Sequence, residues 1–120
     1  MQQSVKQHQP ASVPVKPISR GTTIKHERRT MVVTAYTAND RGMDGKGITA
    51  SGELVQEGRT IAADPSVAFG TKIYIPEFEK TYTVTDRGGA IRGDRLDLYM
   101  EKRSDAIEFG VWELEVWIKK

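Results

Sequence analysis

The sequence predicts an all-β domain, a small barrel of about six strands with two short helical crossovers. Short runs of β-branched and aromatic residues alternate with turn residues, which is typical of strands joined by tight connections. The order strand, polar turn, Phe-Gly, strand occurs twice, around Phe69-Gly70 and Phe109-Gly110, and suggests a pseudo-twofold arrangement. Closing such strands into a barrel would also remove exposed sheet edges.

Length and charge define the domain organisation. A chain of 120 residues with 38% hydrophobic content is sufficient for one domain with a modest core. Residues 1–29 are rich in Gln and Pro and hold six of the 18 Lys and Arg residues, so they are predicted to form a flexible basic linker. The linker is expected to be removable near Arg29 without changing the melting temperature, although it could also act as a basic arm for an anionic polymer or membrane. Residues 30–120 are predicted to form the domain, which is net acidic, so no nucleic-acid partner is expected.

The elements follow one another along the chain. Strands are predicted over 31–37, 59–63, 71–76, 80–85, 95–100 and 111–118, with a short strand or turn over 48–52. The loop 39–47 contains Asp40 and Asp44 but lacks the ligand order of a calcium loop, so a plain connection is favoured. Residues 77–79 are predicted to connect a hairpin. A short helix is predicted over 104–110, with Ser104 as its N-cap and Gly110 as its terminator.

The stretch 84–100 is the candidate site. It holds Asp86, Asp94 and Asp97, separated by glycines that allow sharp turns. Period two places Asp97 on the polar face of a strand, while Asp86 ends the preceding strand, so the glycine loop between them is expected to bring the two carboxyls together. The alternative is that these residues form ordinary turns and surface ion pairs.

Several kinds of site are not expected. The chain has no Cys, and its two histidines, His8 and His26, lie in the N-terminal region, so neither a thiolate zinc site nor a Ser-His-Asp triad is predicted in the domain. Catalysis would have to use carboxylates. No apolar run approaches the roughly 20 residues needed to cross a bilayer, and no signal-peptide core is visible. An export segment or membrane anchor preceding this sequence is left open.

Residues 31–120 resemble the 3D domain, a family named for three aspartates. The resemblance rests on Thr-Ala-Tyr-Thr, Gly-Ile-Thr-Ala-Ser-Gly, Ile-Ala-Ala-Asp-Pro-Ser-Val, Phe-Gly-Thr-Lys-Ile-Tyr-Ile and Thr-Asp-Arg-Gly-Gly-Ala-Ile-Arg-Gly-Asp-Arg-Leu-Asp. The chain is similar in particular to the stationary-phase survival proteins of Gram-positive bacteria, and the catalytic core of that family is similar to membrane-bound lytic transglycosylase A. The resemblance implies a double-psi β-barrel that acts on peptidoglycan outside the cytoplasm, in the cell wall or anchored to the membrane and facing the wall.

The resemblance also implies a set of site residues. The three aspartates are Asp64, Asp86 and Asp97, with Asp97 as the acid/base and the other two as orienting partners that raise its pKa, although these roles could be exchanged. Asp94 is left out of the three, and Arg87 stands where many relatives carry Thr. The expected substrate-binding residues are Tyr36, Thr37, Thr49, Lys72, Gly88 and Gly89.

The implied activity is that of a lytic transglycosylase, which cleaves the bond between N-acetylmuramic acid and N-acetylglucosamine and forms a 1,6-anhydro end. One carboxyl can serve as acid and then as base, so no cofactor and no metal is expected. A non-catalytic glycan-binding module on the same barrel is the main alternative, and a metal-dependent hydrolase using the three aspartates is a third. The partner is expected to be the peptidoglycan strand, and the chain a monomer or a strand-exchanged homodimer.

Overall fold

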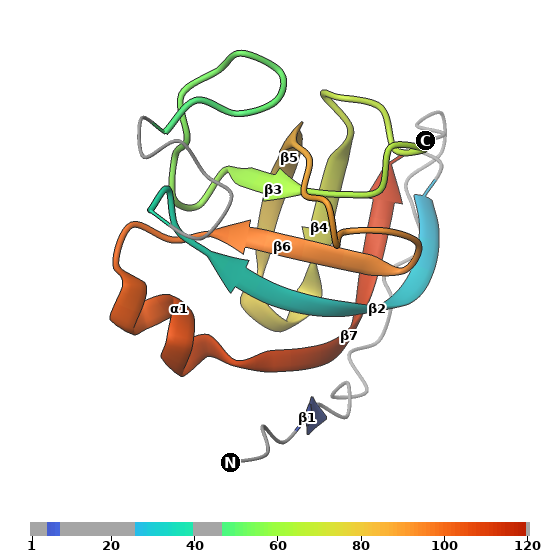
Figure 1. The fold of residues 1–120 in the computed structure, drawn as a ribbon. Helices are drawn as coiled ribbons and strands as arrows, with labels where there is room; N and C mark the ends of the chain where they lie inside the picture. The colour runs from blue at the N-terminus through green and yellow to red at the C-terminus, as the bar shows by residue number, and fades with distance from the viewer. Residues whose placement is uncertain (1–4, 8–25, 40–46, 120) are drawn as a thin grey trace.

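The computed structural model describes residues 5–7, 26–39 and 47–119, which form seven strands and two short helical segments (Figure 1). The predicted linker residues 8–25 and most of the predicted loop 39–47 lie outside the described residues. The elements are β1 Val5–Gln7, β2 His26–Tyr36, β3 Thr60–Ala62, β4 Lys72–Ile75, the 3₁₀ segment η1 Pro76–Phe78, β5 Lys80–Asp86, β6 Arg95–Tyr99, α1 Arg103–Phe109 and β7 Val111–Lys119.

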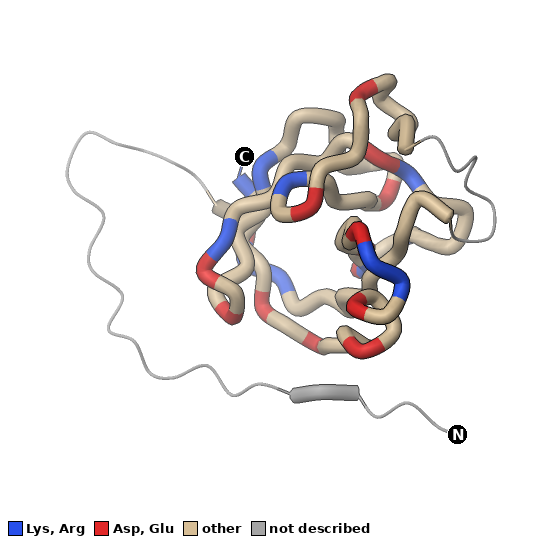
Figure 2. Tube along the Cα trace, turned by 90° about the vertical axis from the view of Figure 1, so that its left-hand side faces the viewer, with Lys and Arg blue, Asp and Glu red and all other residues tan. Residues whose placement is uncertain are grey.

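Six of the strands close into a barrel in the order β2-β6-β3-β5-β4-β7, and β7 pairs back to β2 (Figures 1 and 2). The pairs β2–β6 and β3–β5 are parallel, and the other four pairs in the ring are antiparallel. Strand β1 lies outside this ring and pairs in parallel with Val111–Glu113 of β7. The predicted all-β, six-stranded double-psi barrel is therefore confirmed.

The interior of the barrel is filled by apolar side chains that alternate along every strand, as the period of two requires. These buried residues are Met31, Val33, Ile61, Ala63, Ile73, Ile75, Tyr82, Val84, Leu96, Leu98, Leu114, Val116 and Ile118. Phe78, Phe109 and Trp112 pack against this core from η1, α1 and β7. The alternation along 80–85, 95–100 and 111–118 predicts inward faces for these strands. Leu96 and Leu98, Tyr82 and Val84, and the residues Leu114, Val116 and Ile118 are buried as this predicts, whereas Met100 and Trp112 on the same faces are partly buried.

A second apolar cluster lies on the outer surface of the barrel. It consists of Tyr36, Ala62, Ile91 and Tyr99, with Val55 packed against it. Tyr36 and Tyr99 are register partners on β2 and β6, and their rings meet edge to face at 5.7 Å. Because residues of the connections 47–59 and 87–94 cover this patch, the outer face of the barrel is partly buried here.

Two predicted boundaries differ from the structure. Strand β2 begins at His26, ahead of the predicted domain start at residue 30, because residues 26–29 pair with residues 116–119 of β7. Helix α1 begins at Arg103, and Lys102 occupies its N-cap position with no side-chain hydrogen bond, so the predicted Ser104 cap is wrong. Gly110, with a φ of 72°, ends the helix as predicted. The hairpin β4–β5 around η1 is confirmed.

No helix in the described ranges has the length and apolar character that crossing a bilayer requires.

Residues 26–29 are expected to contribute to stability, which corrects the expected removal point near Arg29. The Arg29 guanidinium lies 3.2 Å from the Asp94 carboxylate, and Arg28 lies 4.5 Å from the centre of the Trp117 ring. A chain that starts at Thr30 loses both contacts and four register pairs, at a cost of about 1–2 kcal/mol relative to a chain that starts at Lys25. Thermal unfolding followed by circular dichroism should show a lower melting temperature by about 4–8 °C for each kcal/mol. Equal melting temperatures would mean that this extension of β2 adds nothing.

Candidate active site

Asp97 and Asp86 belong to one row of paired residues that runs across four strands and is here named the carboxylate row. Asp97 on β6 is the register partner of Thr34 on β2 and of Ala62 on β3, and Ala62 is in turn the partner of Asp86 on β5. Register partners present their side chains on the same face of a sheet. The two carboxyls therefore emerge on the outer face of the barrel on either side of Ala62.

A β-bulge turns Asp86 to this face. Ile61 pairs with Val84 and the next residue, Ala62, pairs with Asp86, so Thr85 is an extra residue on β5. Without the bulge, period two would place Asp86 inside the barrel together with Val84. The expected approach of the two carboxyls through the glycine loop is therefore corrected, because strand β3 and the bulge on β5 set their positions.

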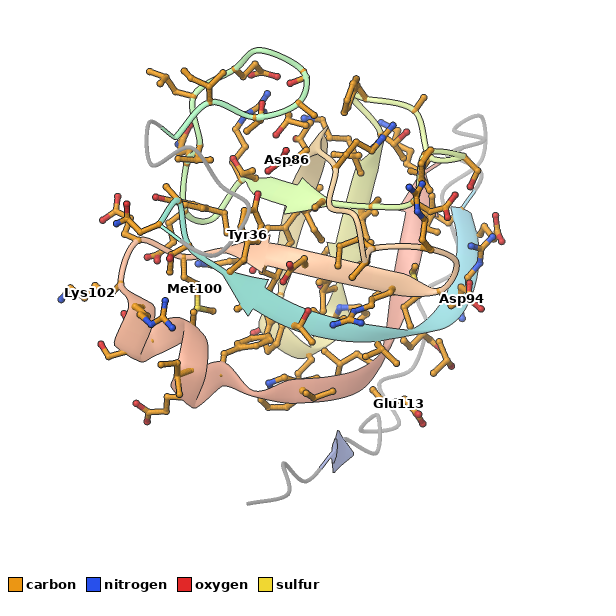
Figure 3. All side chains as sticks on the ribbon, in the orientation of Figure 1. Tyr36, Asp86, Asp94, Met100, Lys102 and Glu113 are labelled. Carbon is orange, nitrogen blue, oxygen red and sulfur yellow. The ribbon has the colours of Figure 1, made fainter. Side chains whose placement is uncertain are left out.

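Asp86 is buried, with 3% of its surface exposed, and accepts three hydrogen bonds. The Tyr36 hydroxyl donates to Oδ2 at 2.5 Å, and the backbone amides of Ala50 and Arg87 donate to Oδ1 at 2.9 Å. Figure 3 shows Tyr36 and Asp86 facing each other at the upper side of the barrel. Since the donors come from β2, the connection 47–59 and the residue that follows β5, this carboxylate joins three parts of the chain.

Both carboxyls contribute to the pKa of the Tyr36 hydroxyl. Its pKa is raised far above the ordinary value, first by burial and then by the hydrogen bond to Asp86, with smaller contributions from the charges of Asp86 and Asp97. Tyr36 therefore keeps its proton and acts as a hydrogen-bond donor.

Asp97 differs from Asp86 in exposure. It is only partly buried, and the Thr34 hydroxyl donates a hydrogen bond of 2.9 Å to its Oδ1. Thr34 comes from the neighbouring parallel strand, so the barrel itself orients the Asp97 side chain. Of the two carboxyls in the row, Asp97 is the one that solvent or a ligand reaches more easily.

Asp64 follows β3 and holds two loops. The backbone amides of Ser66 and Gly93 donate to its two carboxylate oxygens at 2.8 and 2.7 Å. Hydrogen bonds, first from Ser66 and then from Gly93, lower its pKa to about 2. These contacts describe a tether for the β5–β6 connection, which positions the start of β6.

The lowered pKa of Asp64 predicts acid sensitivity in this tether. A group whose pKa is depressed contributes stability above its ordinary value of 3.8, and this contribution disappears as the pH falls toward about 2. The amide proton shift of Gly93, followed by NMR during an acid titration, should change with a midpoint near 2. A midpoint near the ordinary value would show that the hydrogen bond does not form in solution.

Most of the predicted substrate-binding residues lie close to Asp86 in the chain or in space, but several are buried or closely packed within the protein. Thr37 and Thr49 are buried, and the Thr49 hydroxyl contacts Ser51 and donates to the carbonyl of Glu53. Gly88 is packed so closely that an added Cβ would lie 2.8 Å from Ile91. Gly89 is exposed and has open space around it. Their proposed roles toward a ligand stay predictions.

Two residues of the candidate set lie apart from the carboxylate row. Lys72 is on the outer face of β4, where its ammonium group donates to the Thr83 hydroxyl at 2.6 Å and lines a separate cleft. Asp94 pairs with Arg29 and lies well away from Tyr36 and Asp86 (Figure 3). Within the described ranges, no three His, Asp or Glu residues are grouped so that they could hold a metal ion.

Sequence reasoning missed Thr34, Ala50 and Ala62. Thr34 could have been found, because it lies two residues before Tyr36 on the same face of its strand. Nothing in the sequence pointed to the Ala50 amide or to Ala62, since their importance comes from pairing with distant segments. Arg87, flagged as a departure from the family pattern, donates to the carbonyl of Val67 at 2.6 Å and stacks over Phe69 at 4.1 Å.

Comparisons with solved structures show where this fold occurs elsewhere. The barrel is similar to the crystal structure of MltA from E. coli, with a TM-score of 0.50 and 21% identity over 62% of this chain and 28% of that chain. A second structure of the E. coli lytic transglycosylase MltA, in an apo form, has a TM-score of 0.50 and 20% identity over 60% of this chain and 26% of that one. At this level of identity, the likeness concerns the fold.

Sequence comparisons identify the family. The chain is 38% identical over 91 residues to the cell wall-binding protein YocH of Bacillus subtilis, covering 72% of this chain and 31% of that protein. It is 30% identical over 97 residues to the putative cell wall shaping protein YabE of the same organism, covering 78% and 23%. The chain thus spans less than a third of either relative. The sequence model of the 3D domain matches residues 59–120, and the chain therefore belongs to the 3D domain family.

Proposed function

We propose that this protein is a peptidoglycan lytic transglycosylase of the cell wall, with Asp97 as its acid/base. The observation that carries the proposal is the placement of Asp97 and Asp86 on either side of Ala62 on one outer face. Similarity to the MltA fold and to two Bacillus proteins with cell-wall names gives additional support. The proposal implies a location outside the cytoplasm, in the cell wall or anchored to the membrane and facing the wall.

The reaction breaks one bond and forms another within the same sugar. Protonated Asp97 gives its proton to the oxygen that links C1 of N-acetylmuramic acid to N-acetylglucosamine, and the C1–O bond breaks. The C6 hydroxyl of the same muramyl residue attacks C1, while the Asp97 carboxylate accepts the hydroxyl proton. The products are a 1,6-anhydro end and a free N-acetylglucosamine hydroxyl, and Asp97 is protonated again.

The other residues of the row have positioning roles in this proposal. The Thr34 hydroxyl orients Asp97, as its hydrogen bond of 2.9 Å indicates. Asp86 orients Tyr36 and the Ala50 amide at the rim, and its charge favours the protonated form of a neighbouring carboxyl. Asp64 acts at a distance, because its carboxylate accepts a hydrogen bond from the Gly93 amide just ahead of β6.

A glycan-binding module without catalysis is the second candidate. It is favoured by the relative YocH, which is named a cell wall-binding protein. Both functions would use the same outer face of the barrel, where Asp97 is partly exposed. The two candidates differ only in whether the bound strand is cleaved.

Digestion of purified peptidoglycan separates the two candidates. The protein is incubated with isolated cell-wall glycan strands, and the soluble products are analysed by mass spectrometry. A transglycosylase releases anhydro-muropeptides, which are one water lighter than the products of hydrolysis. Strand binding without any release would select the binding module instead.

We expect the activity to survive chelation, because one carboxyl performs both proton transfers. Digestion in excess EDTA should release anhydro-muropeptides at the rate measured without EDTA. A loss of product that is restored by calcium or magnesium would favour the alternative of a metal-dependent hydrolase.

A further inference from the structure

A second surface of the barrel has the composition of an anion-binding site. It is a cleft of about 510 Å³ over β4, β5, β7 and the start of β2, here named the basic cleft. Its lining consists of His26, Arg59, Lys72, Tyr74, Thr81, Thr83, Trp117 and Lys119. Among these described residues there is no Asp or Glu, although the domain as a whole is net acidic.

The cations of the basic cleft are available to a ligand. Lys72 donates to the neutral Thr83 hydroxyl, and neither Lys72 nor Lys119 makes an ion pair with any described residue. Among the described residues, Arg59 is the cation of the cleft that makes an ion pair, with Glu53 at 3.1 Å, and both side chains are substantially exposed. Two unpaired ammonium groups on one rim favour a ligand that carries carboxylates or phosphates.

The floor of the basic cleft is aromatic. The rings of Tyr74 and Trp117 meet at 5.5 Å, His26 packs against Trp117 at 5.8 Å, and both Tyr74 and Trp117 are only partly buried. Arg28 lies over the Trp117 ring at 4.5 Å. Partly exposed rings below a basic rim suit a chain that alternates apolar groups with negative charges.

The basic cleft and the carboxylate row are separate, but they share strand β5. Strand β5 carries Thr83 in the cleft and Asp86 in the carboxylate row, about 10 Å apart for three residues of a strand. Arg59 donates to the Thr83 hydroxyl and to Glu53, in the same connection whose Ala50 amide contacts Asp86. A polymer bound at Asp97 and Asp86 would therefore extend side groups toward the basic cleft.

We propose that the basic cleft binds the acidic peptide stems of the peptidoglycan strand whose sugars lie at the carboxylate row. The proposal rests on the proposed function for the identity of the strand. Stem peptides carry free carboxylates for Lys72 and Lys119, and alanine methyls and aliphatic side chains for Tyr74 and Trp117. The basic cleft would make the protein prefer glycan that carries stems over bare glycan.

The test compares three polymers: glycan strands with stems, the same strands after an amidase has removed the stems, and poly(glycerol phosphate). Binding is measured by calorimetry at low salt for the wild type, Lys119→Glu and Lys102→Glu. Lys102 is exposed and lies beside α1, remote from the basic cleft, so its reversal is a matched control for charge (Figure 3). Lys119→Gln serves as the milder variant if the charge reversal disturbs the end of β7, which melting temperatures will show.

The wild type should bind stem-bearing strands about threefold to tenfold more tightly than stripped strands, as expected for one or two rim charge pairs. Lys119→Glu should abolish this preference, Lys119→Gln should reduce it, and Lys102→Glu should keep it. Equal affinity of the wild type for both strands, no binding at all, or an unchanged preference in Lys119→Glu overturns the proposal. A preference for poly(glycerol phosphate) that depends on Lys119 also overturns it, in favour of a phosphate polymer.

The experiments distinguish failure of the proposal for the basic cleft from failure of the proposed function. Stripped strands still contain the bond that a transglycosylase cleaves, so release of anhydro products from them tests the carboxylate row alone. Stem-dependent binding without any anhydro product would support the role of the basic cleft and contradict the transglycosylase activity. Anhydro product formed without any dependence of binding on stems would support the transglycosylase activity and contradict the role of the basic cleft.

Discussion

Replacing Asp97 with Asn is expected to lower the rate of anhydro-muropeptide release by about 10²–10⁴, the usual contribution of general acid–base assistance. The amide keeps the size of the side chain and can still accept the Thr34 hydrogen bond through its oxygen, but it cannot transfer a proton. Folding and strand binding should therefore persist. The measurements are product release by mass spectrometry, strand binding by calorimetry and the melting temperature.

Asp94→Asn is the matched control for Asp97→Asn. It makes the same chemical change three residues earlier, at a side chain that pairs with Arg29 outside the carboxylate row. Its product release should equal that of the wild type, and the loss of an exposed ion pair should cost less than about 1 kcal/mol of stability. An Asp97→Asn protein that releases product at the wild-type rate would remove Asp97 from the acid role, and Asp86 and Asp64 would be tested next.

Replacing Asp86 with Ala is expected to reduce the free energy of unfolding by about 2–4 kcal/mol. The change removes one acceptor from three donors, the Tyr36 hydroxyl and the amides of Ala50 and Arg87. A buried donor left without a partner costs about 1–3 kcal/mol, and water entering beside the partly exposed amides would recover some of this cost. Urea denaturation followed by tryptophan fluorescence measures the difference.

Tyr36→Phe separates the contribution of the hydroxyl from that of the amides. It removes one donor and leaves Asp86 with two, so the expected cost is about 1 kcal/mol. The double variant should be less destabilised than the sum of the two single variants, because both remove the same hydrogen bond. An unfolding free energy of Asp86→Ala within about 0.5 kcal/mol of the wild type would contradict the role of Asp86 in joining these segments.

The sequence by itself determined the fold class and most of the barrel interior. Alternation along 95–100 and 111–118 identified Leu96, Leu98, Leu114, Val116 and Ile118 as core residues, and all of them are buried. Gly110 was recognised as the helix terminator, because a glycine accepts the positive φ that this position requires. These features depend on residues that are near neighbours in the chain, and a local pattern is enough to reveal them.

Only the tertiary structure decided how the aspartates divide between the row and the loops. The bulge at Thr85, the spacing by Ala62 and the tether from Asp64 to Gly93 all arise from pairing between segments that are far apart in the sequence. The same holds for the start of β2 at His26, which depends on β7 at the other end of the chain. Strand register and bulges are set by non-local hydrogen bonding and burial together, and a one-residue shift reverses the face of every side chain. No periodicity within 84–100 could therefore show which carboxyl faces which.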